Sequence, residues 1–142
     1  MINYITKICF IFFLILSINA NALENKIIYK VNNEIITSLD IDNEIKYLKI
    51  LNPKINDLDK KTILEIGKNS IIREKIKKIQ IRKNTKNLKI DREYLNKLLE
   101  NIYLKINLES EKEFEDYLLI SNLDIQFIKE KISIEVLWNN LI

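Results

Sequence analysis

Residues 29–42 read YKVNNEIITSLDID, and the order of the first elements of the fold can be predicted from them. Two short runs rich in β-branched side chains, 27–31 and 34–37, lie on either side of Asn32-Asn33. Because asparagine tolerates positive φ, this pair suits a two-residue turn. The pattern therefore predicts a β-hairpin, which must pack against helices because two strands alone are marginally stable.

A helix is expected to follow the hairpin directly. Thr37 stands three residues before Asp40, the spacing of a capping box. Asn52-Pro53 should end the helix, because a residue before proline is disfavoured in the α conformation. Apolar residues spaced by three and four predict its inward face. These residues are Ile41, Ile45, Leu48 and Leu51.

Four more helices are predicted from cap residues and apolar periodicity. They cover about 60–83, 92–106, the stretch from Ser110 to about Ile120, and 125–140. The expected caps are Asp57 or Asp59, then Asp91, Ser110 with Glu113 as a second capping box, and Asp124. The expected inward residues are Ile63, Ile66, Ser70, Ile72, Ile76 and Ile79, then Leu95, Leu98, Leu99 and Ile102, then Phe114, Tyr117 and Leu118, and finally Phe127 or Ile128 with Ile132, Val136 and Leu137. The sequence thus predicts a mainly α, multi-helix domain with a short N-terminal β-hairpin.

The composition excludes several classes of chemistry. Hydrophobic residues make up 47% and charged residues 30%, which is typical of a folded domain. The single glycine excludes a Gly-rich phosphate loop, and the absence of histidine excludes His metal ligands and Ser-His triads. The carboxylate pairs Asp40/Asp42 and Asp57/Asp59 lie at helix starts, where capping is their ordinary role. We therefore expect no catalytic residue, no metal site and no cofactor.

The first 22 residues have the layout of a secretory signal peptide. Lys7 precedes an apolar run over residues 8–18, and residues 19–22 end in a small-x-small pattern. Cleavage is expected after Ala22, and the run is too short to span a membrane as a helix. The only cysteine, Cys9, would be removed with this segment. Residues 23–142 are expected to form one exported domain without a membrane-spanning segment.

Two surface features leave alternatives open. The basic run contains Lys75, Lys77, Lys78, Arg82, Lys83, Lys86 and Lys89. It is either a solvated helix face or a cationic strip for anionic lipid or acidic polypeptides. Nucleic acid is an improbable partner because the run lacks stacking aromatic residues. Aromatic residues in the last third, such as Trp138, are either core residues or the lining of an apolar groove.

Three segments, taken in order, carry a further pattern. They are residues 29–42, with a V-N-x-E-I-I-T turn and an acidic helix start, residues 87–95, NLKIDREYL, and residues 114–142, which begin with an F-x3-L pattern. Together they resemble the SurA-type N-terminal domain of periplasmic peptidyl-prolyl isomerases. The resemblance covers nearly all of residues 23–142. It implies a periplasmic, ATP-independent chaperone that binds unfolded outer-membrane proteins.

The resemblance also raises questions about partners. In that family the N-terminal region continues into parvulin isomerase domains and a final helix that packs back onto it. Parvulin sites use histidines, so isomerase activity is not expected of this chain. The alternatives are a truncated isomerase, a homodimer, or a structural partner subunit bound to a protein that supplies the missing helix. Candidate contacts for unfolded polypeptide are Tyr47, Leu51, Phe114, Leu118 and Trp138.

Overall fold

The structure, a computed structural model, describes residues 25–85 and 89–142. The expected signal peptide with its cleavage site at Ala22, together with Lys86, lies outside the described residues. The elements are β1 (Ile27–Val31), β2 (Glu34–Thr37), α2 (Ser38–Leu51), the 3-10 helix η2 (Pro53–Asp57), α3 (Lys60–Asn84), α4 (Arg92–Lys105), α5 (Glu111–Ile120) and α6 (Ile125–Leu141). The predicted fold class, mainly α with a short N-terminal hairpin, is confirmed.

The hairpin forms where the sequence predicts it. β1 and β2 pair antiparallel, with Tyr29 opposite Ile36, and Asn32 in the turn has a φ of 54°. Ile36 is fully buried, whereas Ile35, on the other face of the strand, is 47% exposed. One face of the hairpin therefore packs on the helices, and the other faces solvent.

Local capping fixes where the helices begin. Thr37 and Asp40 form the predicted capping box at the start of α2. The side chains of Asp59, Asp91 and Asp124 cap α3, α4 and α6. At α5, Ser110 accepts from the N–H of Glu113 as predicted. The Glu113 carboxylate, however, accepts from the N–H of Glu109 rather than from that of Ser110, so this capping box is not reciprocal.

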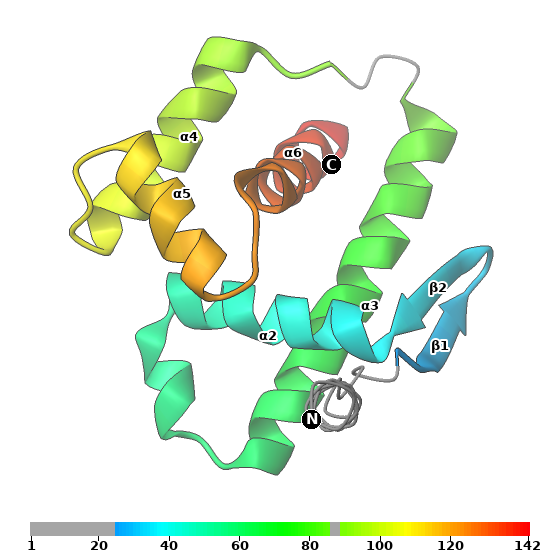
Figure 1. Cartoon of the computed structure of the whole chain (residues 1–142). Helices are drawn as coiled ribbons and strands as arrows, with labels where there is room; N and C mark the ends of the chain where they lie inside the picture. Colours follow the sequence, from blue (N-terminus) through cyan, green and yellow to red (C-terminus); the bar gives the residue numbers. More distant parts are fainter. Residues whose placement is uncertain (1–24, 86–88) are drawn as a thin grey trace, which may run out of the picture.

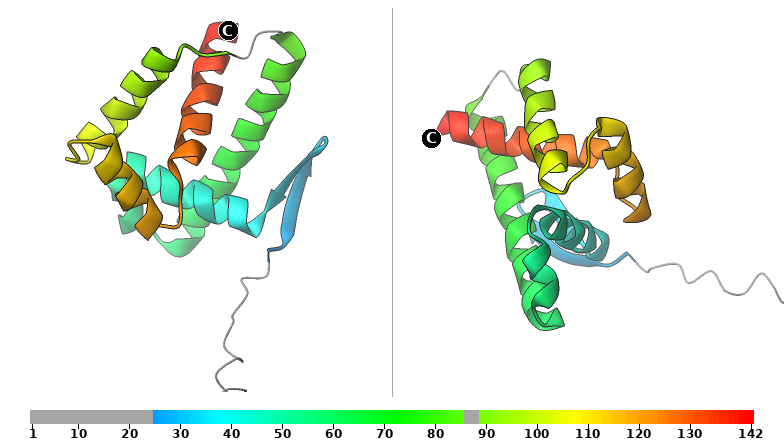
Figure 2. Two further views of the ribbon diagram at one scale, coloured as in Figure 1. Left: turned by 45° about the horizontal axis from the view of Figure 1, so that its top comes forward. Right: turned by 90° about the vertical axis from the view of Figure 1, so that its left-hand side faces the viewer.

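The helices cross rather than form a parallel bundle. In Figure 1, α2 crosses the long helix α3, and the hairpin lies beside α3. Figure 2 shows α6 running between α3 and α4. Helix α5 lies beside the C-terminal end of α4. Helix α6 packs against α3, α4 and α5. It therefore joins the first half of the described chain to the second half.

Two separate hydrophobic clusters form the core. The smaller cluster, here the hairpin core, contains Ile36, Ile41 and Ile71, from β2, α2 and α3. The larger cluster, here the helical core, joins the end of α2 to α4, α5 and α6. Its buried residues are Ile50, Leu99, Phe114, Leu118, Leu123, Ile128 and Ile132. Helix α2 contributes to both, with Ile41 near its start and Ile50 near its end.

The predicted inward face of α3 is only partly right. The buried residues are Gly67, Ile71 and Ile81, whereas the predicted Ile76 is 44% exposed. The other predicted positions, Ile63, Ile66, Ser70, Ile72 and Ile79, are half-buried. α3 is contacted by α2, the hairpin and α6, so no single stripe describes its buried surface. A Cβ on Gly67 would lie 2.5 Å from Ile45 Cγ1, so the glycine permits the close crossing with α2.

Three other inward assignments need correction or refinement. Leu51 is 46% exposed, and the adjacent Ile50 is buried in its place. Tyr117 of α5 is 39% exposed. At α6, Ile128 rather than Phe127 is the fully buried residue. In each case the helical period was right, and the choice between neighbouring positions depended on which helix lies opposite.

Candidate functional site

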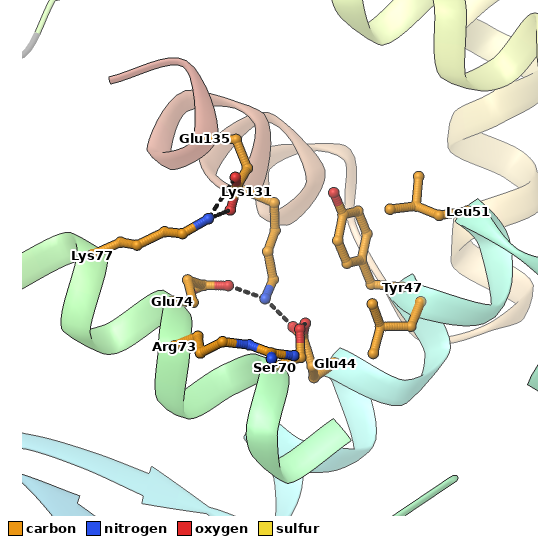
Figure 3. A pocket seen from close by; sticks show the side chains of 10 residues that line it. Glu44, Tyr47, Leu51, Ser70, Arg73, Glu74, Lys77, Lys131 and Glu135 are labelled. Carbon is orange, nitrogen blue, oxygen red and sulfur yellow. Dashed lines mark hydrogen bonds and ion pairs between the residues drawn. The ribbon is translucent and has the colours of Figure 1, made fainter. Parts of the chain in front are cut away.

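A buried ionic cluster lies where α2, α3 and α6 meet. Lys131 of α6 donates to Glu44 of α2 and to Glu74 of α3 (Figure 3). The side chains of Lys131 and Glu44 are only 5% and 2% exposed, and that of Glu74 is 16% exposed. The hydroxyl of Ser70 donates to Glu44 Oε1 at 2.6 Å. The three helices are therefore joined at one point by charged side chains.

The sequence positions of these residues place the cluster between the two cores. Glu44 follows Ile41 by three residues and precedes Ile50 by six, on the inner side of α2. Ile41 belongs to the hairpin core and Ile50 to the helical core. Lys131 lies beside Ile132, another helical-core residue. A layer of charge thus separates two apolar regions.

Aromatic rings surround the ammonium group of Lys131. Its Nζ lies 5.3 Å from the ring centroids of both Tyr47 and Phe127. The two rings meet edge to face, with centroids 6.3 Å apart. Cation–π attraction of this kind contributes about 0.5–2 kcal/mol, more where water is excluded. The rings of Tyr47 and Phe127 therefore add an attractive contact to the ammonium group of Lys131.

Burial shifts the titration of the groups around Lys131. Loss of solvent raises the pKa of Glu74 above the ordinary range of glutamate, and Lys131 only partly offsets this effect. Burial also raises the pKa of Tyr47, with a further contribution from Glu44. Because desolvation opposes the Coulombic attraction in buried ion pairs, the cluster is a poor source of net stability. Removing one partner alone would nevertheless be costly.

A pocket of about 220 Å³ opens beside the cluster. Its lining residues come from α2, α3 and α6, and they are Glu44, Tyr47, Leu48, Leu51, Ser70, Arg73, Glu74, Lys77, Lys131 and Glu135. At the rim, Lys77 Nζ pairs with Glu135 at 2.6 Å and lies 6.0 Å from the ring of Trp138. The pocket therefore combines apolar side chains of α2 with charged groups from all three helices.

The charges of the lining residues balance. Three carboxylates (Glu44, Glu74 and Glu135) stand beside three cations (Arg73, Lys77 and Lys131). The ion pairs Lys131–Glu44, Lys131–Glu74 and Lys77–Glu135 engage most of these charges with one another. Such a surface suits an amphipathic side chain better than a strongly charged ligand. The lining is therefore mixed, and not the apolar groove that was one of the two interpretations of the aromatic residues.

The structure divides the five predicted contact residues into three locations. Tyr47 and Leu51 line the pocket, and Trp138 lies near its rim over Lys77. Phe114 and Leu118 are fully buried in the helical core, so a client cannot touch them in this conformation. The core interpretation holds for these two residues, and we withdraw them as contacts.

The charged cluster itself was not predicted from the sequence. A signal for it exists in the apolar stripes. Glu44 stands three residues after Ile41, and Lys131 stands three residues after Ile128, each at an inward helical position. A charge within such a stripe needs a partner, because unpaired burial is expensive. The pairing of Glu44 with Lys131 across 87 residues could not have been assigned without the fold.

The basic run is partly neutralised. Glu34 of β2 pairs with Arg82 at 2.6 Å and with Lys75 at 3.4 Å, and Lys77 pairs with Glu135. These pairings favour a structural role for the three basic residues over a strip that is open to lipid or acidic polypeptides. Lys78 and Lys83 retain both interpretations.

Comparisons of the chain with protein-family models, curated proteins and solved structures find no match. Within residues 25–85 and 89–142, no group of three or more His, Cys, Asp or Glu side chains is arranged to hold a metal ion. No helix in this described part has the length and apolarity needed to cross a bilayer.

Proposed function

We propose that this chain is an ATP-independent chaperone module that holds unfolded outer-membrane proteins in the periplasm. The signal-peptide layout of the first 22 residues supports export. The order hairpin, capped helix and further helices agrees with the fold that the resemblance of residues 29–42 to SurA-type domains implies. The proposal includes no catalytic role for the chain.

The observation that carries the proposal is an apolar surface on the hairpin and the first turn of α2. Ile27 is 66% exposed, Ile28 40%, Ile35 47% and Leu39 46%. Single exposed apolar residues are ordinary, but several on adjoining elements mark an interaction surface. We call these four residues the hairpin patch.

The geometry of the hairpin suits an extended partner. The described residues place only β1 and β2 in the sheet, so each strand has one edge without a neighbouring strand among them. An extended segment can add to such an edge through main-chain hydrogen bonds, while apolar side chains supply the contact area. Unfolded outer-membrane proteins consist of segments that alternate apolar and polar residues, which match this mode of binding.

A second exposed group supports the alternative, a structural partner subunit. Leu119 and Ile120, at the end of α5, are 62% and 84% exposed. Adjacent exposed apolar residues at a helix end can also form a fixed contact with another folded subunit. This group lies on a different helix from the hairpin patch, so the two interpretations can be tested separately.

The test is suppression of client aggregation. A denatured outer-membrane protein is diluted into buffer with the purified chain in stoichiometric excess, and light scattering is followed. The wild type should suppress aggregation, and Ile28→Thr/Ile35→Thr should reduce suppression at least about threefold, since it removes exposed apolar area without altering the core. The matched control is Leu119→Gln/Ile120→Gln, which should retain full suppression.

The outcomes separate the candidate functions. A folded wild type that does not slow aggregation contradicts the chaperone proposal. A stable complex of fixed stoichiometry in a periplasmic extract, lost in Leu119→Gln/Ile120→Gln, would favour the partner-subunit alternative. Acceleration of prolyl isomerisation in a model peptide would show that the proposal omits an enzymatic activity.

A further inference from the structure

The ionic cluster between the two cores contains one more carboxylate than it has ammonium groups. Lys131 alone bridges Glu44 and Glu74, and both carboxylates come from helices other than its own. With all three groups ionised, the cluster carries a net charge of −1. Since Glu44 and Lys131 are almost fully buried, water can do little to screen that charge.

We propose that the Glu44–Lys131–Glu74 cluster is a proton-operated latch, in which uptake of one proton by the carboxylate pair tightens the attachment of α6 to α2 and α3. The proton comes from solvent and is held by one carboxylate. The cluster changes from a net charge of −1 to neutral, and no other group is consumed or released.

The cluster lies at a place where a change in its net charge alters how firmly α6 is held. Among residues 25–85 and 89–142, no buried residue belongs to both the hairpin core and the helical core. Ile128 and Ile132 hold α6 in the helical core, together with α4 and α5. Toward α3, by contrast, its described side-chain interactions involve charged groups: Lys131 with Glu74, and Lys77 with both Glu135 and the ring of Trp138. Weaker attraction in the ionic layer therefore loosens α6 from α3 without disrupting the helical core.

The other charges around the cluster do not remove the imbalance. On α6, Glu135 is paired with Lys77 of α3. On α3, Arg73 lines the pocket but is exposed, so water screens its charge. Tyr47 of α2 stays neutral because its pKa is raised. The remaining nearby cation, Lys75, is paired with Glu34 of β2.

The direction of the pH effect follows from Glu74. Burial raises its pKa in the folded protein above the ordinary value. A group with a raised folded-state pKa contributes stability that is present below its unfolded-state pKa and is lost as pH rises through the folded-state pKa. The latch is therefore tightest below the ordinary pKa of glutamate, and it loosens as pH rises through the raised pKa of Glu74.

Amide hydrogen exchange of the purified chain tests the latch. Protection of α6, corrected for the intrinsic pH dependence of exchange, is measured between about pH 5 and about pH 8. In the wild type, protection should fall as pH rises, by up to about tenfold per pH unit, the limit for one proton. In Glu74→Gln it should be flat across this range, at the level that the wild type reaches in mild acid.

Glu135→Gln is the matched control, because it makes the same chemical change on the same junction at an exposed position. It should keep the pH profile of the wild type. Glu44→Gln also leaves one carboxylate for one ammonium, so it should flatten the pH profile of protection. If Glu74→Gln does not fold, Glu44→Gln provides the test instead. A wild-type profile that is flat or rises with pH overturns the latch. A wild-type slope retained in either folded cluster variant does so as well.

Discussion

Lys77 Nζ lies 2.6 Å from both carboxylate oxygens of Glu135, joining α3 to α6 across 58 residues of sequence. The pair lies at the rim of the pocket, and the side chain of Glu135 is 51% exposed. The buried cluster of Lys131 joins the same two helices. Two ion pairs at one junction therefore differ mainly in burial, which makes them a natural comparison.

We expect the exposed pair to contribute little. Glu135→Gln should lower the free energy of unfolding by less than about 1 kcal/mol, because water screens the attraction and ordering both side chains costs entropy. A double-mutant cycle with Lys77→Met, measured by urea unfolding, gives the coupling energy directly. A coupling above about 2 kcal/mol would show that the rim pair is a principal link between α3 and α6.

The buried lysine should behave differently. Lys131→Met leaves Glu44 and Glu74 buried without a counter-ion, so the free energy of unfolding should fall by about 3–5 kcal/mol. Lys129→Met, on the same helix, removes only a partly exposed pair with Glu111 and should cost below about 1 kcal/mol. Equal decreases in the free energy of unfolding of the two variants, measured by urea unfolding, would show that the buried cluster contributes no more to stability than a partly exposed pair.

Glu34 should contribute to loss of stability in acid. Burial alone would raise its pKa, but Lys75 and Arg82 together outweigh that effect and lower it. A depressed pKa means stability that is present above the unfolded-state pKa and lost as pH falls through the folded-state pKa. Glu34→Gln should therefore show a shallower loss of thermal stability in strong acid than the wild type. An unchanged acid limb would show that these two ion pairs do not act on Glu34 in solution.

Gly67 should resist replacement by alanine although it lies inside a helix. Alanine favours a helix by about 1 kcal/mol over glycine. Its Cβ would, however, lie 2.5 Å from Ile45 Cγ1. Overpacking of this kind costs about 1–3 kcal/mol, so we expect Gly67→Ala to be neutral or destabilising by up to about 2 kcal/mol.

The partner residue supplies the control for Gly67. In an Ile45→Ala background the clash disappears, and Gly67→Ala should then raise the free energy of unfolding by about 1 kcal/mol. Urea unfolding of the four proteins in this cycle measures the coupling between the two positions. Additive effects would mean that α2 and α3 do not touch at this point.

The features predicted from sequence are those determined by neighbouring residues. The hairpin turn at Asn32 and the capping box of Thr37 with Asp40 depend on residues within four positions of one another. The buried face of α3 depends instead on three separate elements packed against it. The spacing of apolar residues along the sequence does not show where each of these contacts begins or ends. For this reason Ile76 was assigned to the core and Ile71 was not.

The candidate site was beyond sequence analysis for a related reason. Its pairs join residues 44, 74 and 131, and each pairing follows from a helix crossing rather than from a local pattern. Tyr47 and Leu51, which were predicted from sequence as contacts for unfolded polypeptide, do line the pocket, because they lie on the part of α2 that faces α3 and α6 there. Their role as contacts stays a prediction. The sequence could indicate the region, but the chemistry of the region needed three-dimensional contacts.

Asn107 and Asn122 have φ values of 61° and 53°, one on each side of α5. Glycine is the usual residue for left-handed backbone, but the chain's only glycine lies in α3 instead. The path of the chain into and out of α5 thus depends on two asparagines that look like ordinary surface residues. If α5 is transferred to another scaffold or exchanged between related chains, residues 107–122 should be moved together as one segment.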